Sequence, residues 1–229
     1  MEILHGLREL SSLSKSKSAV IYGGSFNPPH IGHIAILSYA LDFFDADFYI
    51  VPTRTPPHKK VDVPFNKRFD WAAKTFSIYD LDNLFITDME NYIEGTNYAI
   101  KNVEYFTRYY EDVILLVGED ALGSIESWYE YEKLLGIAKL AVYPRTREGS
   151  LYKRGKSVLG ALYSRIIGLD FPLFEVSSSA IRDRVRNGKS IIGLVPECIR
   201  KDVEKVYIAE SKISKGGTQI CQRVSCLVK

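Results

Sequence analysis

Short apolar runs alternate with longer amphipathic stretches from residue 18 onward. The runs are rich in β-branched and aromatic residues, and they predict strands at residues 19–22, 48–51, 84–87, 113–118, 140–143 and 174–176. The stretches between them predict helices at residues 31–44, 66–79, 97–110, 127–136, 179–187 and, after Pro196, 197–208. This alternation predicts an α/β fold with a doubly wound, mainly parallel sheet, in which ligands bind beyond the carboxyl ends of the strands.

The two ends of the chain do not share this alternation. Residues 1–17 contain the polar segment SSLSKSKS and are expected to form a loose polar leader. Residues 18–210 are expected to form one domain, a normal size for an α/β fold, and residues 211–229 a flexible tail.

Composition excludes some classes of protein. The chain has 30 Lys and Arg against 28 Asp and Glu, and a net charge of +2 argues against a large nucleic-acid surface. No apolar run is long enough to span a membrane, and the first residues are too polar for a signal peptide. The three cysteines are few and odd in number, which favours reduced thiols and a cytoplasmic protein. The oligomeric state stays open, a homo-oligomer included.

The segment GGSFNPPHIGHIAI, residues 23–36, follows the first predicted strand directly. Gly24 allows the backbone to approach a ligand closely, and the next helix is expected to begin near His30. His30 and His33 would share one face of its first turn, where free N–H groups and the helix dipole favour an anion. These residues therefore predict a phosphate site. The alternatives are incidental surface histidines and a metal pair, for which no Cys, Asp or further His lies nearby.

The segment VSSSAIRDR, residues 176–184, predicts a second phosphate site. Ser178 and Ser179 lie at a helix start, where hydroxyls and free N–H groups bind anions. Arg182 follows three residues later on the same turn, and its guanidinium can bind two phosphate oxygens at once. An ordinary capped surface helix is the alternative.

The first segment resembles the signature G-x-[FY]-[DN]-P-x-x-x-G-H of the nucleotidyltransferase superfamily, and the chain most resembles its bacterial nicotinate-nucleotide adenylyltransferases. The resemblance extends over about residues 18–208. Further motifs carry it in the same order: RTPPHKK (54–60), EGTNYAIKNVEYF (94–106), VGEDALGSIESWYEYEKLL (117–135), YPR (143–145) and VSSSAIRDRVRNGKSIIGLVPECI (176–199).

The resemblance implies adenylyl transfer from ATP to nicotinate mononucleotide, with Mg²⁺ bridging the phosphates. It implies that His30, His33 and Arg182 are catalytic. The residues implied for ATP are Gly24, Ser25, Phe26, Asp120, Arg145, Ser178 and Ser179, and those for the mononucleotide are Asn27, Lys59, Asn97 and Trp128. Each of four residues also has a structural alternative: a solvated loop lysine for Lys59, a helix cap for Asp120, a core residue for Trp128 and a surface residue for Arg145.

The chain also departs from the family pattern. Ser25 and Asn27 stand where many members have Thr and Asp, and both changes keep polar groups. The family's Ser-Tyr-Thr is Asn97-Tyr98-Ala99 here, so a hydroxyl expected to contact the substrate carboxylate is missing. We therefore expect a preference for nicotinate over nicotinamide mononucleotide that is narrower than in relatives.

Three rival interpretations share part of these motifs. Phosphopantetheine adenylyltransferase shares the first motif but should lack the WYEY segment. A class I aminoacyl-tRNA synthetase would use residues 30–33 and the KISK at 212–215, yet the chain leaves no room for an anticodon-binding domain. A nucleotide sensor without catalysis would not require both histidines and Arg182 together.

Overall fold

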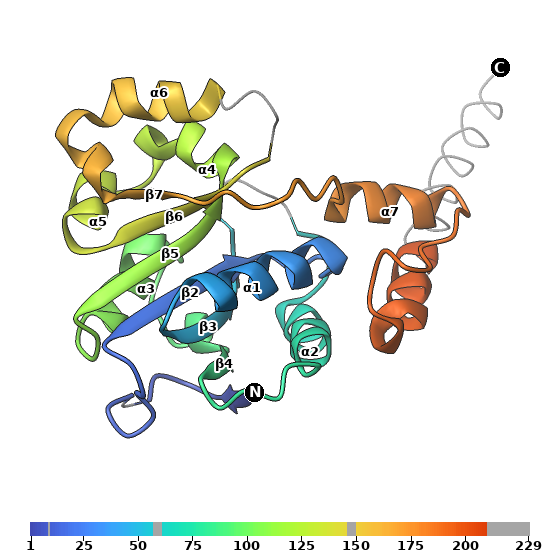
Figure 1. Ribbon diagram of the computed structural model, residues 1–229. Coiled ribbons are helices and arrows are strands. Elements are labelled where there is room, and N and C mark those ends of the chain that lie inside the picture. The colour runs from blue at the N-terminus through green and yellow to red at the C-terminus, as the bar shows by residue number, and fades with distance from the viewer. Residues whose placement is uncertain (9, 57–60, 146–149, 210–229) are drawn as a thin grey trace, which may run out of the picture.

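A seven-stranded parallel sheet forms the centre of the molecule, with helices on both faces (Figure 1). The computed structural model describes residues 1–8, 10–56, 61–145 and 150–209. Its strands are β1 Glu2–Leu4, β2 Ser18–Gly24, β3 Asp47–Pro52, β4 Leu84–Thr87, β5 Asp112–Gly118, β6 Lys139–Tyr143 and β7 Ile166–Gly168. The spatial order is β1-β4-β3-β2-β5-β6-β7, and every neighbouring pair is parallel.

The sheet changes its winding direction between β2 and β5. From β2 the chain moves outward through β3 and β4, then returns to β5 on the other side of β2 and moves outward through β6 and β7. The connections therefore diverge at the carboxyl ends of β2 and β5, which are Gly24 and Gly118. Such a point is where open parallel sheets leave a crevice for ligands.

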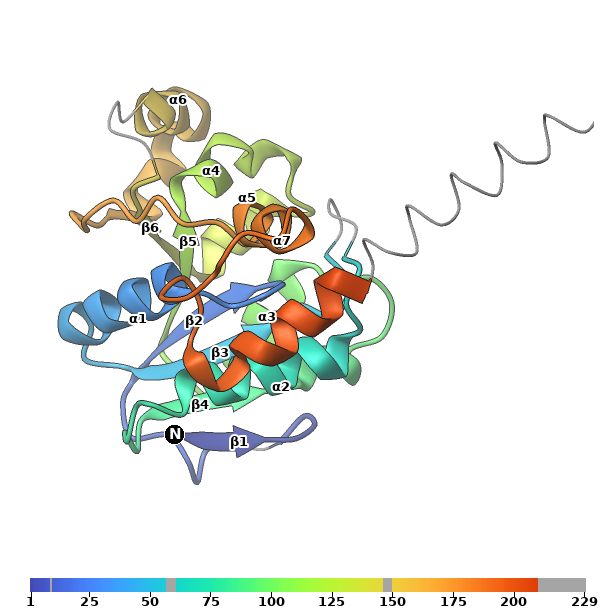
Figure 2. The same ribbon diagram turned by 90° about the vertical axis from the view of Figure 1, so that its right-hand side faces the viewer.

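The helices cover the sheet and extend beyond one side of it. Their bounds are α1 Ile31–Phe43, α2 Phe65–Phe76, α3 Ala99–Phe106, α4 Glu119–Gly123, α5 Tyr131–Ile137, α6 Ser150–Leu159 and α7 Ser178–Arg186, with short 3₁₀ turns η1 Met89–Asn91, η2 Ile125–Ser127 and η3 Gly160–Arg165. Residues 197–209 are also helical. Figure 2 shows this last helix lying alongside α2.

Alternate side chains of the strands enter two apolar cores. The side chain of Ile21 belongs to the core under α3 and α5, whereas that of Val20, the preceding residue, belongs to the core under α1 and α2. This is the pattern of strands that are buried on both faces. A third cluster joins Trp71 of α2 to residues of α7 and of the 197–209 helix, among them Tyr207. The C-terminal helices are therefore packed against α2 by an apolar contact of their own.

The predicted doubly wound parallel sheet is confirmed, and so are the strands predicted at 19–22, 48–51, 84–87, 113–118 and 140–143. The strand predicted at 174–176 is wrong, because these residues are irregular and β7 is the last strand. The apolar side chains of this stretch have another partner: Phe171 and Phe174 lie against Tyr39 of α1, with ring centroids 5.3 and 6.0 Å apart.

The helices depart from the prediction in several places. The helix predicted at 127–136 is divided, because η2 ends at Ser127 and α5 begins only at Tyr131. Glu130, between them, has a left-handed φ of 52°, which no continuous helix contains. The short α4 and the helix α6 were not predicted.

The expectation of a loose leader is wrong for the start of the chain. Residues 2–4 form β1, which pairs with β4 through Ile3 and Ile86. Leu4 and Leu10 are both 2% exposed and belong to the core under α3. The apolar residues that flank the polar segment supply this packing. The boundaries expected at residues 18 and 210 stay predictions.

The tail expected at 211–229, with its KISK segment and two of the three cysteines, lies outside the described residues. Cys198 is exposed and is a free cysteine. Within the described part of the chain, no helix combines the length and the apolar character needed to cross a membrane.

Leu4→Ala should destabilise the protein by about 2–3 kcal/mol, because it removes a buried leucine side chain. Ile3→Ala is the matched control: Ile3 is the neighbouring residue of β1 and is 46% exposed, so its loss should cost less than about 1 kcal/mol. Urea unfolding of both variants measures the difference. Equal losses would show that β1 is not a fixed strand of the sheet.

Candidate active site

The loop between β2 and α1 has a tightly folded backbone. Phe26 adopts a φ of 44°, in the left-handed region that residues other than glycine rarely enter. Its ring is 1% exposed and lies edge-on to Tyr22 and His33, with centroids 5.9 and 5.1 Å away. A Cβ atom at Gly24 would lie 3.1 Å from this ring, so any larger residue at position 24 would press against the packed phenylalanine.

His30 and His33 meet at the start of α1, as the sequence predicts. His30 is the N-cap residue and is 3% exposed, and His33 is half-buried one turn later. The backbone N–H of His30 donates to Nδ1 of His33 at 3.1 Å, and the two rings are 3.7 Å apart. Because Nδ1 of His33 accepts this bond, the neutral ring carries its proton on Nε2, where it can donate to a ligand.

Helix α7 is bound to this loop by side chains of the second predicted phosphate segment. Arg182 donates from Nη1 to the carbonyl of Asn27 at 2.8 Å and from Nη2 to Oγ of Ser179 at 3.1 Å. Oγ of Ser178 donates to the carbonyl of Pro28 at 2.8 Å. The two segments that the sequence predicts as phosphate sites therefore lie in contact with each other.

The 197–209 helix completes the loop from the other side. The hydroxyl of Tyr207 donates to Oδ1 of Asn27 at 2.7 Å, and both side chains are buried. The backbone N–H of Ile31, at the start of α1, donates to the carbonyl of Leu194 at 3.1 Å. Asn27 therefore has a positioning contact with its own fold, beside the ligand contact that the family resemblance implies.

Arg68, which the sequence analysis did not single out, holds several backbone segments around the loop. It is 1% exposed, and its guanidinium donates to four carbonyl oxygens, those of Val63, Ser25, Thr53 and Arg54, at 2.6–3.0 Å. Burial lowers the pKa of Arg68, and the nearby Glu90 opposes this. The sequence could have revealed this residue, because Arg68 is the one charged residue on the buried face of the amphipathic helix α2.

A cavity of about 300 Å³ lies next to the loop, on the α3 side of the sheet. Strand residues, among them Ile21 and Leu115, form its apolar part, and Gly24 joins it to the loop. The rings of Tyr98 and Tyr129 are stacked 4.4 Å apart at its wall. The remaining lining residues are Gly23, Thr53, Pro56, Glu90, Asn97, Ala99, Asn102, Leu116, Val117 and Trp128. This volume is at the small end of ligand pockets and suits one aromatic ring with its substituents.

Glu90 organises the polar wall of this cavity. It is 3% exposed and accepts from the backbone N–H of Arg54 at 2.7 Å and from Nδ2 of Asn102 at 2.9 Å. Asn97 donates from Nδ2 to the carbonyl of Glu90 at 3.0 Å. Burial raises the pKa of Glu90, and the bonds from Asn102 and Arg54 oppose that shift.

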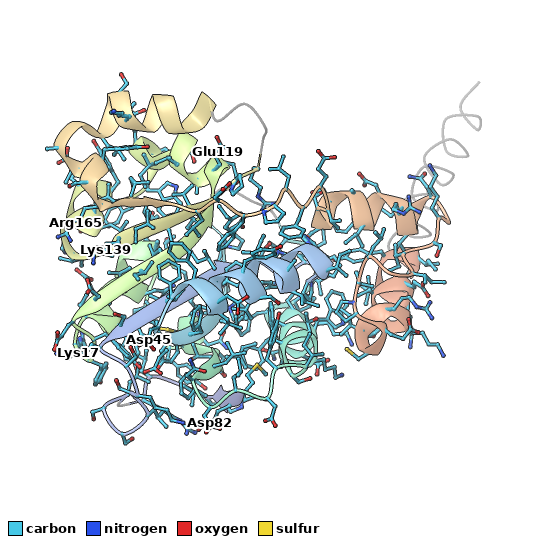
Figure 3. All side chains as sticks on the ribbon, in the orientation of Figure 1. Lys17, Asp45, Asp82, Glu119, Lys139 and Arg165 are labelled. Atoms are coloured by element: carbon cyan, nitrogen blue, oxygen red, sulfur yellow. The ribbon has the colours of Figure 1, made fainter. Side chains whose placement is uncertain are left out.

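Asp120 and Arg145 form a pair at the next strand ends. Arg145 lies 3.6 Å from Oδ1 of Asp120, and its guanidinium lies over the ring of Tyr143. The backbone N–H of Arg145 donates to Glu119, a buried residue at the start of α4 that Figure 3 labels. Lys17, just before β2, and Lys139, the first residue of β6, are also labelled there and lie at the opposite edge of the sheet.

The structure therefore groups the predicted residues in three neighbouring places. The loop and α7 bring together Gly24, Ser25, Phe26, Asn27, His30, His33, Ser178, Ser179 and Arg182. Asn97 and Trp128 line the cavity, and Asp120 and Arg145 pair at the ends of β5 and β6. Lys59 lies outside the described residues. The roles predicted for all these residues stay predictions.

Comparison with known proteins identifies the class first. Residues 21–184 match the cytidylyltransferase-like family model, so the chain is a nucleotidyltransferase by fold and by sequence. It is 60% identical over 212 residues to a probable nicotinate-nucleotide adenylyltransferase of Fervidobacterium nodosum, covering 91% of this chain and 98% of that protein. A protein of the same description from Thermotoga maritima is 42% identical, over 87% of this chain and 97% of that protein. The chain belongs to the nicotinate-nucleotide adenylyltransferase family.

Solved structures support the fold. The Plasmodium falciparum nicotinic acid mononucleotide adenylyltransferase complexed with NaAD matches with a TM-score of 0.62 and 19% identity, over 85% of this chain and 96% of that chain. A putative nicotinate-nucleotide adenylyltransferase from Vibrio parahaemolyticus matches with a TM-score of 0.57 and 17% identity, over 84% of this chain and 99% of that chain. At these identities the comparison shows a shared fold alone.

Tyr207→Phe should destabilise the protein by about 1–3 kcal/mol, because it leaves the buried Oδ1 of Asn27 without its donor. Tyr92→Phe, at a tyrosine that is 55% exposed, is the control and should change stability by less than about 0.5 kcal/mol. The measurement is chemical unfolding of both variants. A Tyr207 variant as stable as the control would mean that the hydroxyl does not hold the loop.

Proposed function

We propose that this protein transfers the adenylyl group of ATP to nicotinate mononucleotide, giving nicotinate adenine dinucleotide and pyrophosphate, a step of NAD biosynthesis. One observation carries the proposal: the loop that leads from β2 to His30 and His33 at the start of α1 adjoins a cavity sized for an aromatic ring, because Gly24 begins that loop and also lines the cavity. Membership of the family supports the choice of substrates.

The reaction needs little from protein acids or bases. The phosphate oxygen of the mononucleotide attacks the α-phosphorus of ATP, a new P–O bond forms, and the bond to the bridging oxygen of pyrophosphate breaks. The attacking oxygen is already ionised at neutral pH, so no side chain has to remove a proton. The protein accelerates such a step by holding the two phosphates in line and by neutralising the charge that moves to the leaving group.

The donors around the loop suit that task. His33 lies in the first turn of a helix of 13 residues, whose dipole favours negative charge, and its Nε2–H would donate to a phosphate oxygen. Arg182 uses one N–H on each terminal nitrogen to bind the protein, and a guanidinium has five N–H groups in all. Nε–H is buried, so one N–H on each terminal nitrogen would bind the β- and γ-phosphates.

Mg²⁺ is the expected cofactor and would enter with ATP. The side chains around the loop named above are imidazoles, hydroxyls and a guanidinium, and none of them is a carboxylate, the side chain through which proteins chiefly bind Mg²⁺. The ion, which prefers phosphate oxygens and water, would therefore be held chiefly by the substrate. When bound, it neutralises phosphate charge, while His33 and Arg182 orient the phosphates.

The direct test is release of pyrophosphate from ATP with nicotinate mononucleotide, nicotinamide mononucleotide and phosphopantetheine as separate acceptors. The proposal expects the highest kcat/KM with nicotinate mononucleotide. Release with phosphopantetheine alone would assign the chain to a different acceptor.

His33→Ala should lower kcat by about 100-fold or more, because it removes a donor that acts on the transition state. Its cost in stability should be only about 1 kcal/mol, that of one lost capping contact. His5→Ala is the control, since the side chain of His5 is 60% exposed and pairs with Asp88 away from the loop. A His33 variant that melts early but turns over normally would show that His33 is structural.

Arg182→Lys should lower kcat/KM for ATP by about 10-fold or more, because lysine cannot keep the contacts to Asn27 and Ser179 while also binding phosphate with a planar fork. Arg184→Lys is the matched control on the same helix, where Arg184 donates to the carbonyl of Ser190. The assay is pyrophosphate release at limiting ATP. Equal rates for the two variants would contradict a phosphate role for Arg182.

A further inference from the structure

Resting on the function proposed above, we propose that Asn102 is a specificity-determining residue and that it lets the cavity accept nicotinamide mononucleotide as a second substrate. The two mononucleotides share a cationic pyridinium ring, a ribose and a phosphate. Stacked aromatic rings and a nearby carboxylate suit that ring in both of them. Only the ring substituent differs: a carboxylate only accepts hydrogen bonds, whereas a carboxamide also donates two.

Hydrogen bonds within the wall fix the orientation of the Asn102 amide. Oε2 of Glu90 accepts from the backbone N–H of Arg54, and Oε1 accepts from Nδ2 of Asn102. A carboxylate cannot donate, so the amide of Asn102 must face it with its NH₂ group and direct Oδ1 elsewhere. Glu90 therefore determines on which side of the amide the acceptor Oδ1 lies.

Oδ1 of Asn102 is a buried acceptor in need of a donor. Among the described residues it has no hydrogen-bond partner, and Asn102 is 7% exposed while lining the cavity. A buried carbonyl oxygen without a donor costs free energy until one reaches it. An N–H of a bound carboxamide would supply the donor, whereas a carboxylate could not.

The acceptors of the lining favour the same conclusion. Glu90 is the one ionisable acid or base among the described lining residues apart from the tyrosines, and its two oxygens act as acceptors for Arg54 and Asn102. A nicotinate carboxylate therefore meets two acceptors at this wall, and Ala99 offers it no hydroxyl. Backbone N–H groups at the start of α3 can still receive a carboxylate, so we expect both substrates to react rather than one to replace the other.

The first experiment compares kcat/KM for the two mononucleotides in the wild-type enzyme, by pyrophosphate release from ATP. A site built to reject an analogue by hydrogen bonding reaches about 10⁴-fold discrimination. The proposal expects kcat/KM for the nicotinate form to exceed that for the nicotinamide form by less than about 1,000-fold. A larger ratio overturns the role of Asn102 but leaves the proposed function standing. Release with neither mononucleotide would overturn the proposed function as well, so the two failures can be told apart.

The second experiment removes the acceptor. Asn102→Leu keeps the approximate volume and should raise the ratio about 10-fold, because the carboxamide loses its partner and the carboxylate does not. Asn83→Leu is the matched control, since Asn83 donates to the carbonyl of Ala46 at the opposite end of the sheet, and its ratio should equal that of the wild type. An Asn102 variant in which both substrates weaken equally would show a merely structural role and overturn the proposal.

A third variant tests the cause by reversing the amide. In Glu90→Gln, the side-chain carbonyl of the glutamine would still accept from the backbone N–H of Arg54, and its NH₂ group would face Asn102. The amide of Asn102 must then turn its Oδ1 toward Gln and present Nδ2 where the acceptor was. The ratio should rise at least about 10-fold, now chiefly through faster reaction of the nicotinate form. An unchanged ratio in the folded variant overturns the proposal, and this test remains if the Asn102→Leu variant does not fold.

Discussion

The loop after β2 keeps its shape because the last third of the chain holds it. Arg182, Ser178 and Tyr207 bind residues 27 and 28 across sequence separations of 155, 150 and 180 residues. Contacts over such distances form only when the C-terminal helices are docked against α2. The left-handed backbone of Phe26, and with it the placement of His30 and His33, therefore depends on tertiary packing far along the sequence.

A second guanidinium holds the same loop from the opposite side. Arg68 donates to the carbonyl of Ser25, two residues before the carbonyl that Arg182 binds. It also binds the carbonyl of Arg54, whose N–H donates to Glu90, which in turn accepts from Asn102. One chain of hydrogen bonds thus runs from the phosphate loop to the wall of the ring cavity. In-line attack requires both phosphates at fixed relative positions, and this network supplies a physical reason for that fixity.

The sequence was sufficient for the features that depend on local pattern. The strand–helix alternation predicted the sheet, and the spacing of His30, His33 and Arg182 predicted donors at helix starts. It was insufficient where a residue's role depends on a distant partner. Tyr207 resembles any buried tyrosine until Asn27 is placed beside it, and residues 2–4 become a strand only because the edge of β4 is open to them.

Two polar residues in otherwise apolar helix faces could have been identified from the sequence as residues with a buried partner. Arg68 belongs to the buried set of α2, and Asn102 to that of α3 between Ile100 and Val103. A polar side chain in such a position must find a partner, because its burial without one is costly. The pattern alone thus predicts that each binds something, although only the fold shows what.

The same network links substrate choice to phosphate positioning. The direction of the Asn102 amide is set by Glu90, Glu90 is held by the N–H of Arg54, and the carbonyl of Arg54 is held by Arg68. Arg68 also holds Ser25, so a shift of the loop that carries the phosphate donors changes the cavity wall as well. Tyr207 holds the same loop at Asn27, so its effect on the cavity wall passes through the loop, whereas Glu90 and Asn102 line the wall themselves. Changes at Glu90 or Asn102 should therefore alter the relative rates of the two mononucleotides more than changes at Tyr207.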